Sequence, residues 1–223
     1  CYDGVINKIS LKNFFLFIIF FPQLIAGPIV QYNYMMPQFS NSKTISVMKK
    51  YILIGLVVFA IGMFKKVFIA DNLSIIVESI FSGDEPLNFI HTWVGTFSFT
   101  MQIYFDFSGY IDMATGAALL FGINLPVNFD SPYKSKSINE FWQKWHITLS
   151  NFLMNFIYFP LSRSIKVITF NKSMIFILIT FILAGLWHGP SWNYVIFGGI
   201  HGLGIIFHHF FKKKYNFKIY KFV

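Results

Sequence analysis

Residues 184–192 read AGLWHGPSW and lie between two strongly apolar runs. The first run covers residues 174–186, and the second covers residues 194–211. Glycine and proline between two such runs favour a turn, so this part of the chain predicts a hairpin of membrane-type helices with His188 at its bend. An ionisable group at membrane depth is costly, and it usually faces a protein-lined or watery cavity and serves a function. A histidine that caps a helix end or anchors at the interface is an equally good interpretation of this stretch alone.

Basic residues on both sides of the predicted hairpin indicate its orientation. Lys172 precedes the first apolar run, and a basic tail over residues 212–221 follows the second. Positively charged residues favour the cytoplasmic side of a membrane. If both clusters mark that side, a helix carries His188 roughly 24 Å inward, past the middle of a hydrocarbon core about 30 Å thick. The sequence therefore places His188 in or near the outer half of the membrane.

The composition is that of a membrane protein. Of the 223 residues, 55% are hydrophobic, 21% are aromatic and only 12% are charged, whereas a soluble domain has about 25% charged residues. The apolar runs are continuous, which excludes the dyad alternation of a membrane β-barrel. The sequence predicts an all-α, polytopic helical membrane protein with tilted and re-entrant helices, anchored in the lipid bilayer.

The net charge of +9 does not indicate a nucleic-acid partner. Cations lie at the edges of apolar runs, where they are predicted to set topology and to contact lipid headgroups; they are Lys49, Lys50, Lys65, Lys66, Lys166, Lys172 and residues 212–214. Cys1 is the single cysteine, which excludes a disulfide framework and a cysteine-based metal site. The chain begins at Cys1 without a signal-peptide pattern, so we expect it to be a piece of a longer protein.

Several apolar runs are interrupted. Residues 11–30 contain Pro22, Gly27 and Pro28, which predict a bent or re-entrant element, with an ordinary kinked helix as the alternative. Residues 39–50 are predicted to form a loop or an amphipathic connection. The run over residues 51–64 is short for a membrane span.

The next apolar run, residues 67–80, carries Asp71, Asn72 and Glu78 and is predicted to be tilted or partly buried in protein. A turn is expected at residues 83–86, which read GDEP. The long apolar stretch over residues 87–123 carries two acids, Asp106 and Asp112, and residues six apart do not share a helix face as i,i+4 pairs do. We therefore expect each acid to bond a helix end, a lysine or another polar group rather than to form a catalytic carboxylate pair.

A helix is predicted after the polar segment 124–134. Ser137 is its expected N-cap, and Glu140 is the expected partner in a capping box. Continued through residue 150, the helix would place Trp142, Trp145 and His146 on one aromatic stripe. A histidine on such a stripe is either a packed residue or part of a site, and the pattern leaves both interpretations open.

Four phrases then occur in a fixed order. They are FPQLIAGP at residues 21–28, QIYFDFSGY at residues 102–110, EFWQKWHITLS at residues 140–150 and GLWHG at residues 185–189. Together they closely resemble the membrane-bound O-acyltransferase (MBOAT) family, in its bacterial alginate O-acetyltransferase branch. The resemblance covers residues 15–210 or so; a Gly-Gly-Asn-Arg-like turn expected after Pro160 is missing.

The resemblance implies one membrane-embedded domain over residues 1–223, truncated at both ends. It implies an enzyme that modifies a cell-envelope polysaccharide, with His188 as the catalytic histidine and His146 as the second polar residue of the site. His201 matches a further histidine of the bacterial branch. The supporting candidates are Trp187, Trp142 and Asp106.

The mechanistic hypothesis is acyl transfer to a hydroxyl. His188 would act as general base, while His146 positions the acyl carbonyl or stabilises charge; a histidine nucleophile that forms an acyl-enzyme is the alternative. The histidine spacing does not favour a metal site. No bound cofactor is expected.

The resemblance also suggests substrates, partners and location. The donor would be acetyl-CoA or a carrier-protein thioester, and a periplasmic or extracellular acyltransferase would be a partner. The protein would cross the bacterial inner membrane several times. D-alanyl transfer to teichoic acid, a transporter or flippase with a His/Asp proton relay, and a scaffolding subunit are the alternatives.

Overall fold

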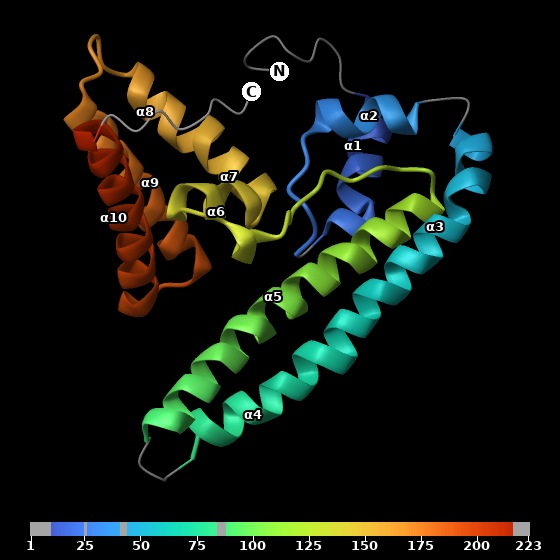
Figure 1. The fold of residues 1–223 in the computed structure, drawn as a ribbon. Coiled ribbons are helices and arrows are strands. Elements are labelled where there is room, and N and C mark those ends of the chain that lie inside the picture. The colour runs from blue at the N-terminus through green and yellow to red at the C-terminus, as the bar shows by residue number, and fades with distance from the viewer. Residues whose placement is uncertain (1–9, 25, 41–43, 84–87, 216–223) are drawn as a thin grey trace. The chain divides into compact units, whose positions relative to one another are not determined.

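The computed structural model describes residues 10–24, 26–40, 44–83 and 88–215, and these residues form helices without any strand (Figure 1). The prediction of an all-α fold is confirmed. Contacts divide the chain into two compact units, residues 1–126 and residues 127–223. Each unit is described by itself.

The first unit begins with a helix that stops abruptly. Helix α1 (Leu11–Ile19) is followed by the single 3-10 turn η1 (Phe21–Gln23) and by α2 (Tyr32–Phe39). Proline lacks an amide donor and fixes φ, so Pro22 is compatible with the 3-10 turn but not with a continued helix. The break in residues 11–30 is thus confirmed, and the alternative of an ordinary kinked helix is wrong.

A continuous helical rod follows. It consists of α3 (Thr44–Phe64), a π-helical segment η2 (Lys65–Ala70) and α4 (Asp71–Phe81), and residues 51–81 are apolar enough to cross a membrane. The prediction of a loop over residues 39–50 is wrong from Thr44 onward, where α3 begins. The run over residues 51–64, short for a span by itself, continues through η2 and α4 into one long apolar helix. The predicted turn at residues 83–86 lies largely outside the described residues.

The reason that the rod continues lies in helix α5 (Phe89–Leu120), which runs back alongside it (Figure 1). Lys65 Nζ lies 2.5 Å from Asp112 Oδ2, and Lys66 Nζ lies 2.8 Å from Asp106 Oδ1. The two lysines are paired inside the helical hairpin, so their predicted role as interfacial charges is wrong. The prediction that both acids bond a lysine or another polar group is confirmed.

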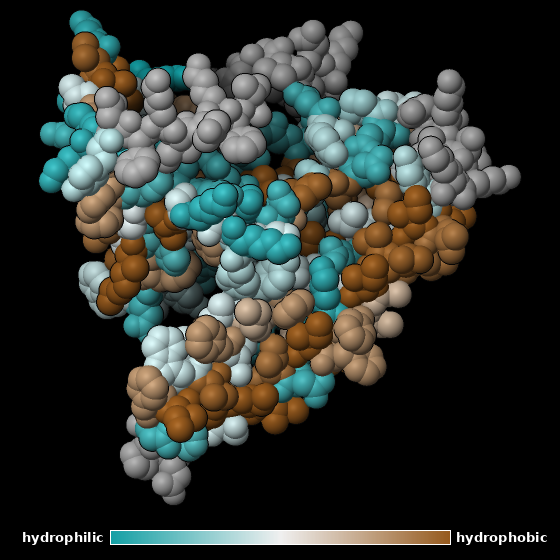
Figure 2. All heavy atoms as spheres, in the orientation of Figure 1, coloured by the Kyte–Doolittle hydropathy of each residue, from teal (hydrophilic) through white to brown (hydrophobic). Residues whose placement is uncertain are grey.

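The apolar surface of this hairpin is extensive. Figure 2 shows hydrophobic side chains along the outer face of α3, α4 and α5, and Leu53, Phe68 and Phe89 are 71%, 65% and 77% exposed. In contrast, a small core forms where α1, α2 and the end of α5 meet, with Phe20, Met35, Ala114, Ala118, Ile123 and Leu125. An outward apolar face on long helices suits contact with lipid tails.

The second unit consists of a short-element layer and a long hairpin. The short elements are η3 (Pro132–Lys134), α6 (Ile138–Lys144), α7 (Ile147–Leu153), the π-helical η4 (Met154–Tyr158) and α8 (Phe159–Arg163). The hairpin is α9 (Phe170–His188) and α10 (Trp192–Tyr215), and both helices are long and apolar enough to span a membrane. The predicted hairpin is confirmed, and His188 is the last residue of its first helix.

Candidate functional site

The helix predicted over residues 137–150 is interrupted, which creates the centre of the site. Helix α6 ends at Lys144, Trp145 is extended (φ −99°, ψ 127°), and His146 is left-handed (φ 43°, ψ 56°) before α7 begins. Trp142 and His146 therefore do not belong to one helical stripe, and that prediction is wrong.

A distant loop causes the interruption. The Asp130 amide donates to the Lys144 carbonyl (3.0 Å), and the Ile147 amide donates to the Asn128 carbonyl (3.0 Å). The Trp145 ring packs on Phe129, with ring centroids 5.0 Å apart. The loop thus makes the hydrogen bonds that the Lys144 carbonyl and the Ile147 amide would otherwise make within a continuous helix, and it adds an aromatic contact to Trp145.

The N-terminal end of α6 follows the prediction only in part. Ser137 is the N-cap, and its hydroxyl accepts from the Glu140 amide at 3.1 Å. The Glu140 carboxylate, however, accepts from the Lys136 amide at 2.8 Å rather than from the Ser137 amide. The bond to Lys144 and the Lys136 amide lower the pKa of the Glu140 carboxyl. The Ser137 cap fixes the start of α6, which then runs from Ile138 to Lys144, directly before the interruption at Trp145 and His146.

His146 is buried in this interruption and held by Asn128. The side chains of His146 and Asn128 are 6% and 1% exposed, and His146 Nδ1 lies 3.1 Å from Asn128 Oδ1. The same oxygen accepts from the Thr148 amide (3.1 Å) and the Thr148 hydroxyl (2.9 Å). Burial, together with the neighbouring His188, lowers the pKa of His146 to about 4. The imidazole is therefore neutral at pH 7.

The other two histidines share an aromatic wall. The Phe197 ring centroid lies 6.2 Å from that of His188 and 4.5 Å from that of His201, so one phenyl ring of α10 touches both imidazoles. The Trp142 ring meets His201 edge to face at 5.1 Å. The structure therefore brings the predicted His146, His188 and His201 into one unit.

Of the supporting candidates, Trp142 and Trp187 lie near the histidines, and Asp106 lies in the other unit. Trp142 belongs to the cluster, since its ring also contacts Phe181 of α9 at 5.1 Å. Trp187 lies 5.0 Å from His188 between ring centroids, but it is 64% exposed. Asp106 belongs to the first unit, where Lys66 is its partner. A structural role in the helical hairpin explains Asp106.

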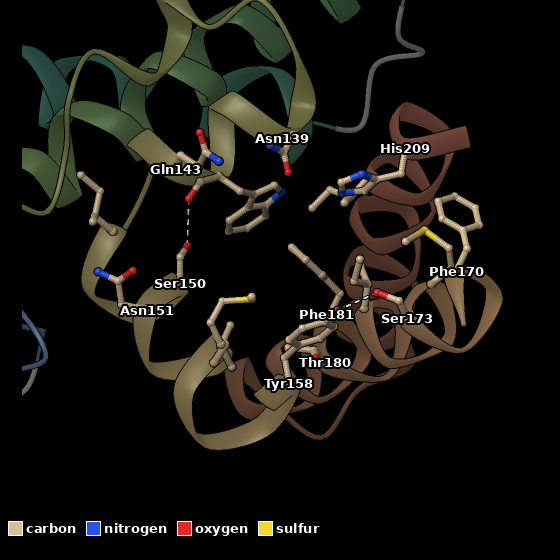
Figure 3. Close-up of a pocket in the computed structure, with 17 residues that line it drawn as sticks. Asn139, Gln143, Ser150, Asn151, Tyr158, Phe170, Ser173, Thr180, Phe181 and His209 are labelled. Atoms are coloured by element: carbon tan, nitrogen blue, oxygen red, sulfur yellow. Dashed lines mark hydrogen bonds between the residues drawn. The ribbon is translucent and has the colours of Figure 1, made fainter. Parts of the chain in front are cut away.

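A cavity of about 710 Å³ lies in the second unit (Figure 3). Figure 3 shows polar side chains of α6 and α7, among them Asn139, Gln143 and Ser150, on one side and side chains of α9 and α10 on the other. Trp142 also lines it, and its indole nitrogen is buried without a hydrogen-bond partner among the described residues. The remaining lining residues are Ile147, Asn151, Leu153, Met154, Tyr158, Phe170, Ser173, Met174, Ile177, Thr180, Phe181, Ile205 and His209.

Sequence reasoning missed Asn128 and this cavity. Asn128 stands in a polar segment whose sequence gives no sign of a partner 18 residues away. His209 also lines the cavity. Among the residues that the structure describes, no three His, Cys, Asp or Glu side chains are arranged to hold a metal ion.

The chain is similar to one protein family and to several named proteins over most of its length. The model of the membrane-bound O-acyltransferase family matches residues 2–222. The peptidoglycan O-acetyltransferase of Helicobacter pylori is 43% identical over 219 residues, which are 95% of this chain and 41% of that protein. The probable alginate O-acetylase of Pseudomonas aeruginosa is 40% identical over 196 residues, which are 87% of this chain and 36% of that protein.

A more distant relative is the teichoic acid D-alanyltransferase of Bacillus subtilis. It is 27% identical over 217 residues, which are 95% of this chain and 55% of that protein. The chain therefore spans from about a third to about half of the length of these relatives.

Proposed function

Because this chain belongs to the membrane-bound O-acyltransferase family, we propose that its histidine site transfers an acetyl group to a hydroxyl of a cell-surface polysaccharide. The relatives named for acetyl transfer to peptidoglycan and alginate are 43% and 40% identical, against 27% for the relative named for D-alanyl transfer. Acetyl is therefore favoured as the transferred group. The bacterial inner membrane is the proposed location.

The observation that carries the proposal is the pair His146 and His188. One imidazole is buried and neutral, and the second stands at the end of α9, close enough to affect the first electrostatically. A neutral imidazole suits proton transfer from a hydroxyl. A cluster with this chemistry is not needed by a scaffold.

In the proposed reaction, His188 is the proton acceptor, and a C–O bond replaces the C–S bond of the donor. His188 takes the proton of the acceptor hydroxyl while the oxygen attacks the carbonyl carbon of a thioester. The new C–O bond forms, the C–S bond breaks, and the imidazolium returns its proton to the leaving thiolate. The donor is a thioester, acetyl-CoA or a carrier-protein conjugate, and a periplasmic or extracellular acyltransferase is the proposed partner that receives or passes on the group.

The cavity is the proposed space for the donor's acyl-bearing arm. Its volume of about 710 Å³ lies within the range of about 300–1,000 Å³ that small-molecule sites occupy. Its walls are mainly apolar, with amide and hydroxyl groups between them. Trp142 lines the cavity and its ring contacts His201, so a group bound in the cavity would end near this histidine.

The test uses the whole protein encoded by the gene, in its own membrane. His188→Ala is expected to remove ester-linked acetate from the surface polymers, by at least about 10²-fold, because the proposed general base is lost. Acetate released by mild alkali is measured with protein levels matched in the membrane fraction. Unchanged acetate in the His188→Ala strain would refute the proposal, and substrate-coupled proton flux without acetate transfer would favour a transporter.

A further inference from the structure

The buried amide of Asn128 decides which nitrogen of His146 carries the proton. The Thr148 backbone amide can only donate, so the Asn128 atom 3.1 Å from it is the oxygen. The Thr148 hydroxyl donates to the same oxygen at 2.9 Å. The orientation of the Asn128 side chain is therefore set by Thr148, independently of the histidine.

The same oxygen faces His146 Nδ1 at 3.1 Å. Two acceptors cannot share a hydrogen bond, so Nδ1 carries the proton and donates it to Asn128. A neutral imidazole has one N–H group, and His146 is buried and neutral at pH 7. Nε2 is then the nitrogen with the lone pair.

The contact between Asn128 and His146 is kept although it costs folding free energy, which indicates a functional role. Asn128 Nδ2 is buried without a hydrogen-bond partner among the described residues, and an unsatisfied buried donor costs about 1–3 kcal/mol. His146 also holds a left-handed backbone, which is unfavourable for a residue with a Cβ. Ser131 and His146 are the two non-glycine residues with positive φ in the part of the chain that the structure describes. Such strain gathers at functional sites.

We propose that Asn128 is a positioning residue that holds His146 as the Nδ1-protonated tautomer, so that Nε2 of His146 acts as a hydrogen-bond acceptor in the reaction. This inference rests on the proposed acyl transfer and changes one part of it. An imidazole whose single N–H group donates to Asn128 has no second N–H group for an acyl carbonyl. His146 therefore accepts a hydrogen bond, from the acceptor hydroxyl or from the protonated His188, instead of stabilising the oxyanion.

The first test is spectroscopic and does not depend on activity. The whole protein is labelled with ¹⁵N-histidine, and the spectrum of His146→Gln is subtracted from that of the wild type at about pH 7. A protonated Nδ1 and an unprotonated Nε2 are expected for His146, and Asn128→Ala is expected to lose this signature. An Nε2-protonated or doubly protonated His146 in the wild type would overturn the proposal.

The second test is rescue of acetate transfer. Asn128→Ala is expected to lower kcat at least about tenfold, because the partner that selects the tautomer is gone. Asn128→Asp keeps an oxygen that accepts from Nδ1 and is expected to restore most of kcat. The kcat of Asn128→Asp is measured at about pH 8, because the new carboxylate raises the pKa of His146 and favours the imidazolium at lower pH.

Thr148→Val is the matched comparison for a purely structural role. It removes one hydrogen bond from the same Asn128 oxygen but leaves the Thr148 amide and the His146 contact in place. It is expected to retain the Nδ1-protonated signature. Wild-type kcat in Asn128→Ala would overturn the role of Asn128. Wild-type acetate transfer in His188→Ala would overturn the proposed function instead.

Discussion

The left-handed backbone of His146 is the feature on which the site depends at the scale of single residues. A left-handed residue with a Cβ costs roughly 1–2 kcal/mol, and His146 has φ 43° and ψ 56°. The conformation turns the chain between α6 and α7 and directs the imidazole to Asn128 rather than along a helix face. The left-handed turn at His146 is thus what brings the imidazole to Asn128.

Two substitutions at His146 separate this strain from the contacts of the imidazole. His146→Ala and His146→Gly both lose the bond to Asn128, but only glycine is unstrained at positive φ. His146→Gly is therefore expected to be more stable than His146→Ala by roughly 1 kcal/mol, with both inactive in acetate transfer. Thermal unfolding of the purified whole protein measures the difference. Equal or greater stability of His146→Ala would contradict a strained turn.

At the scale of elements, the hairpin of α3 and α5 is closed by facing glycines. A Cβ on Gly62 would lie 2.6 Å from the Gly109 carbonyl oxygen, and a Cβ on Gly55 would lie 2.8 Å from the Gly116 carbonyl oxygen. Backbones that approach this closely place the π-helical η2 next to α5, where its lysines reach Asp106 and Asp112. A π-helical turn often marks a functional position, but here it serves the pairing of charges.

Because α3 and α5 approach closely at Gly62, whereas Gly199 has open space around it, alanine is expected to affect stability differently at the two glycines. Gly62→Ala is expected to destabilise the protein by about 1–3 kcal/mol, because the helices must separate. Gly199→Ala on α10 meets no atom within 4 Å and is expected to be neutral or stabilising by up to about 1 kcal/mol. Thermal stability of the two variants in the same detergent is the measurement. Tolerance of alanine at Gly62 would show that α3 and α5 do not pack through this pair.

The cavity between the short helices and the α9–α10 hairpin allows a test of donor binding. Ile177 lines it, whereas Ile179 on the same helix is 37% exposed. Ile177→Trp is expected to fill the cavity and raise KM for the thioester donor at least about tenfold, with Ile179→Trp as the matched control. Steady-state kinetics with varied donor provide the measurement. An unchanged KM in Ile177→Trp would place the donor elsewhere.

At the scale of the whole molecule, the charges at the ends of the second unit's hairpin indicate its orientation. The Lys213 ammonium lies 4.3 Å from the centroid of the Phe170 ring, and Phe170 and Phe210 rings are 5.0 Å apart. The start of α9 and the end of α10 therefore meet, and both basic clusters lie at one end of the hairpin. The bend with His188 is at the opposite end.

This arrangement predicts the side on which the basic end lies. In a whole protein without other cysteines, Lys213→Cys is expected to react with a membrane-impermeant maleimide only after the cells are opened, because lysine clusters favour the cytoplasm. Labelling of intact cells is the measurement, and a cysteine in a known periplasmic segment is the control. Labelling of Lys213→Cys in intact cells would reverse the orientation and put His188 nearer the cytoplasm.

The sequence determined the helical class, the α9–α10 hairpin with His188 at its bend, the Ser137 cap and the family. These features follow from composition, apolar runs and local hydrogen bonds, which involve residues near one another in the chain. The candidate histidines were also identified, although only the resemblance gave them a role.

The tertiary structure alone decided the rest of the site. Loop residues 128–130 exchange hydrogen bonds with the segment 144–148, so a helix predicted by its own periodicity is broken at His146. Lys65 and Lys66 remain inside a helix beside Asp112 and Asp106, which are distant in the chain, and Lys66 also pairs with the nearby Asp71. Local patterns cannot report such partners, because the free energy of a buried hydrogen bond or ion pair depends on groups that only folding brings together.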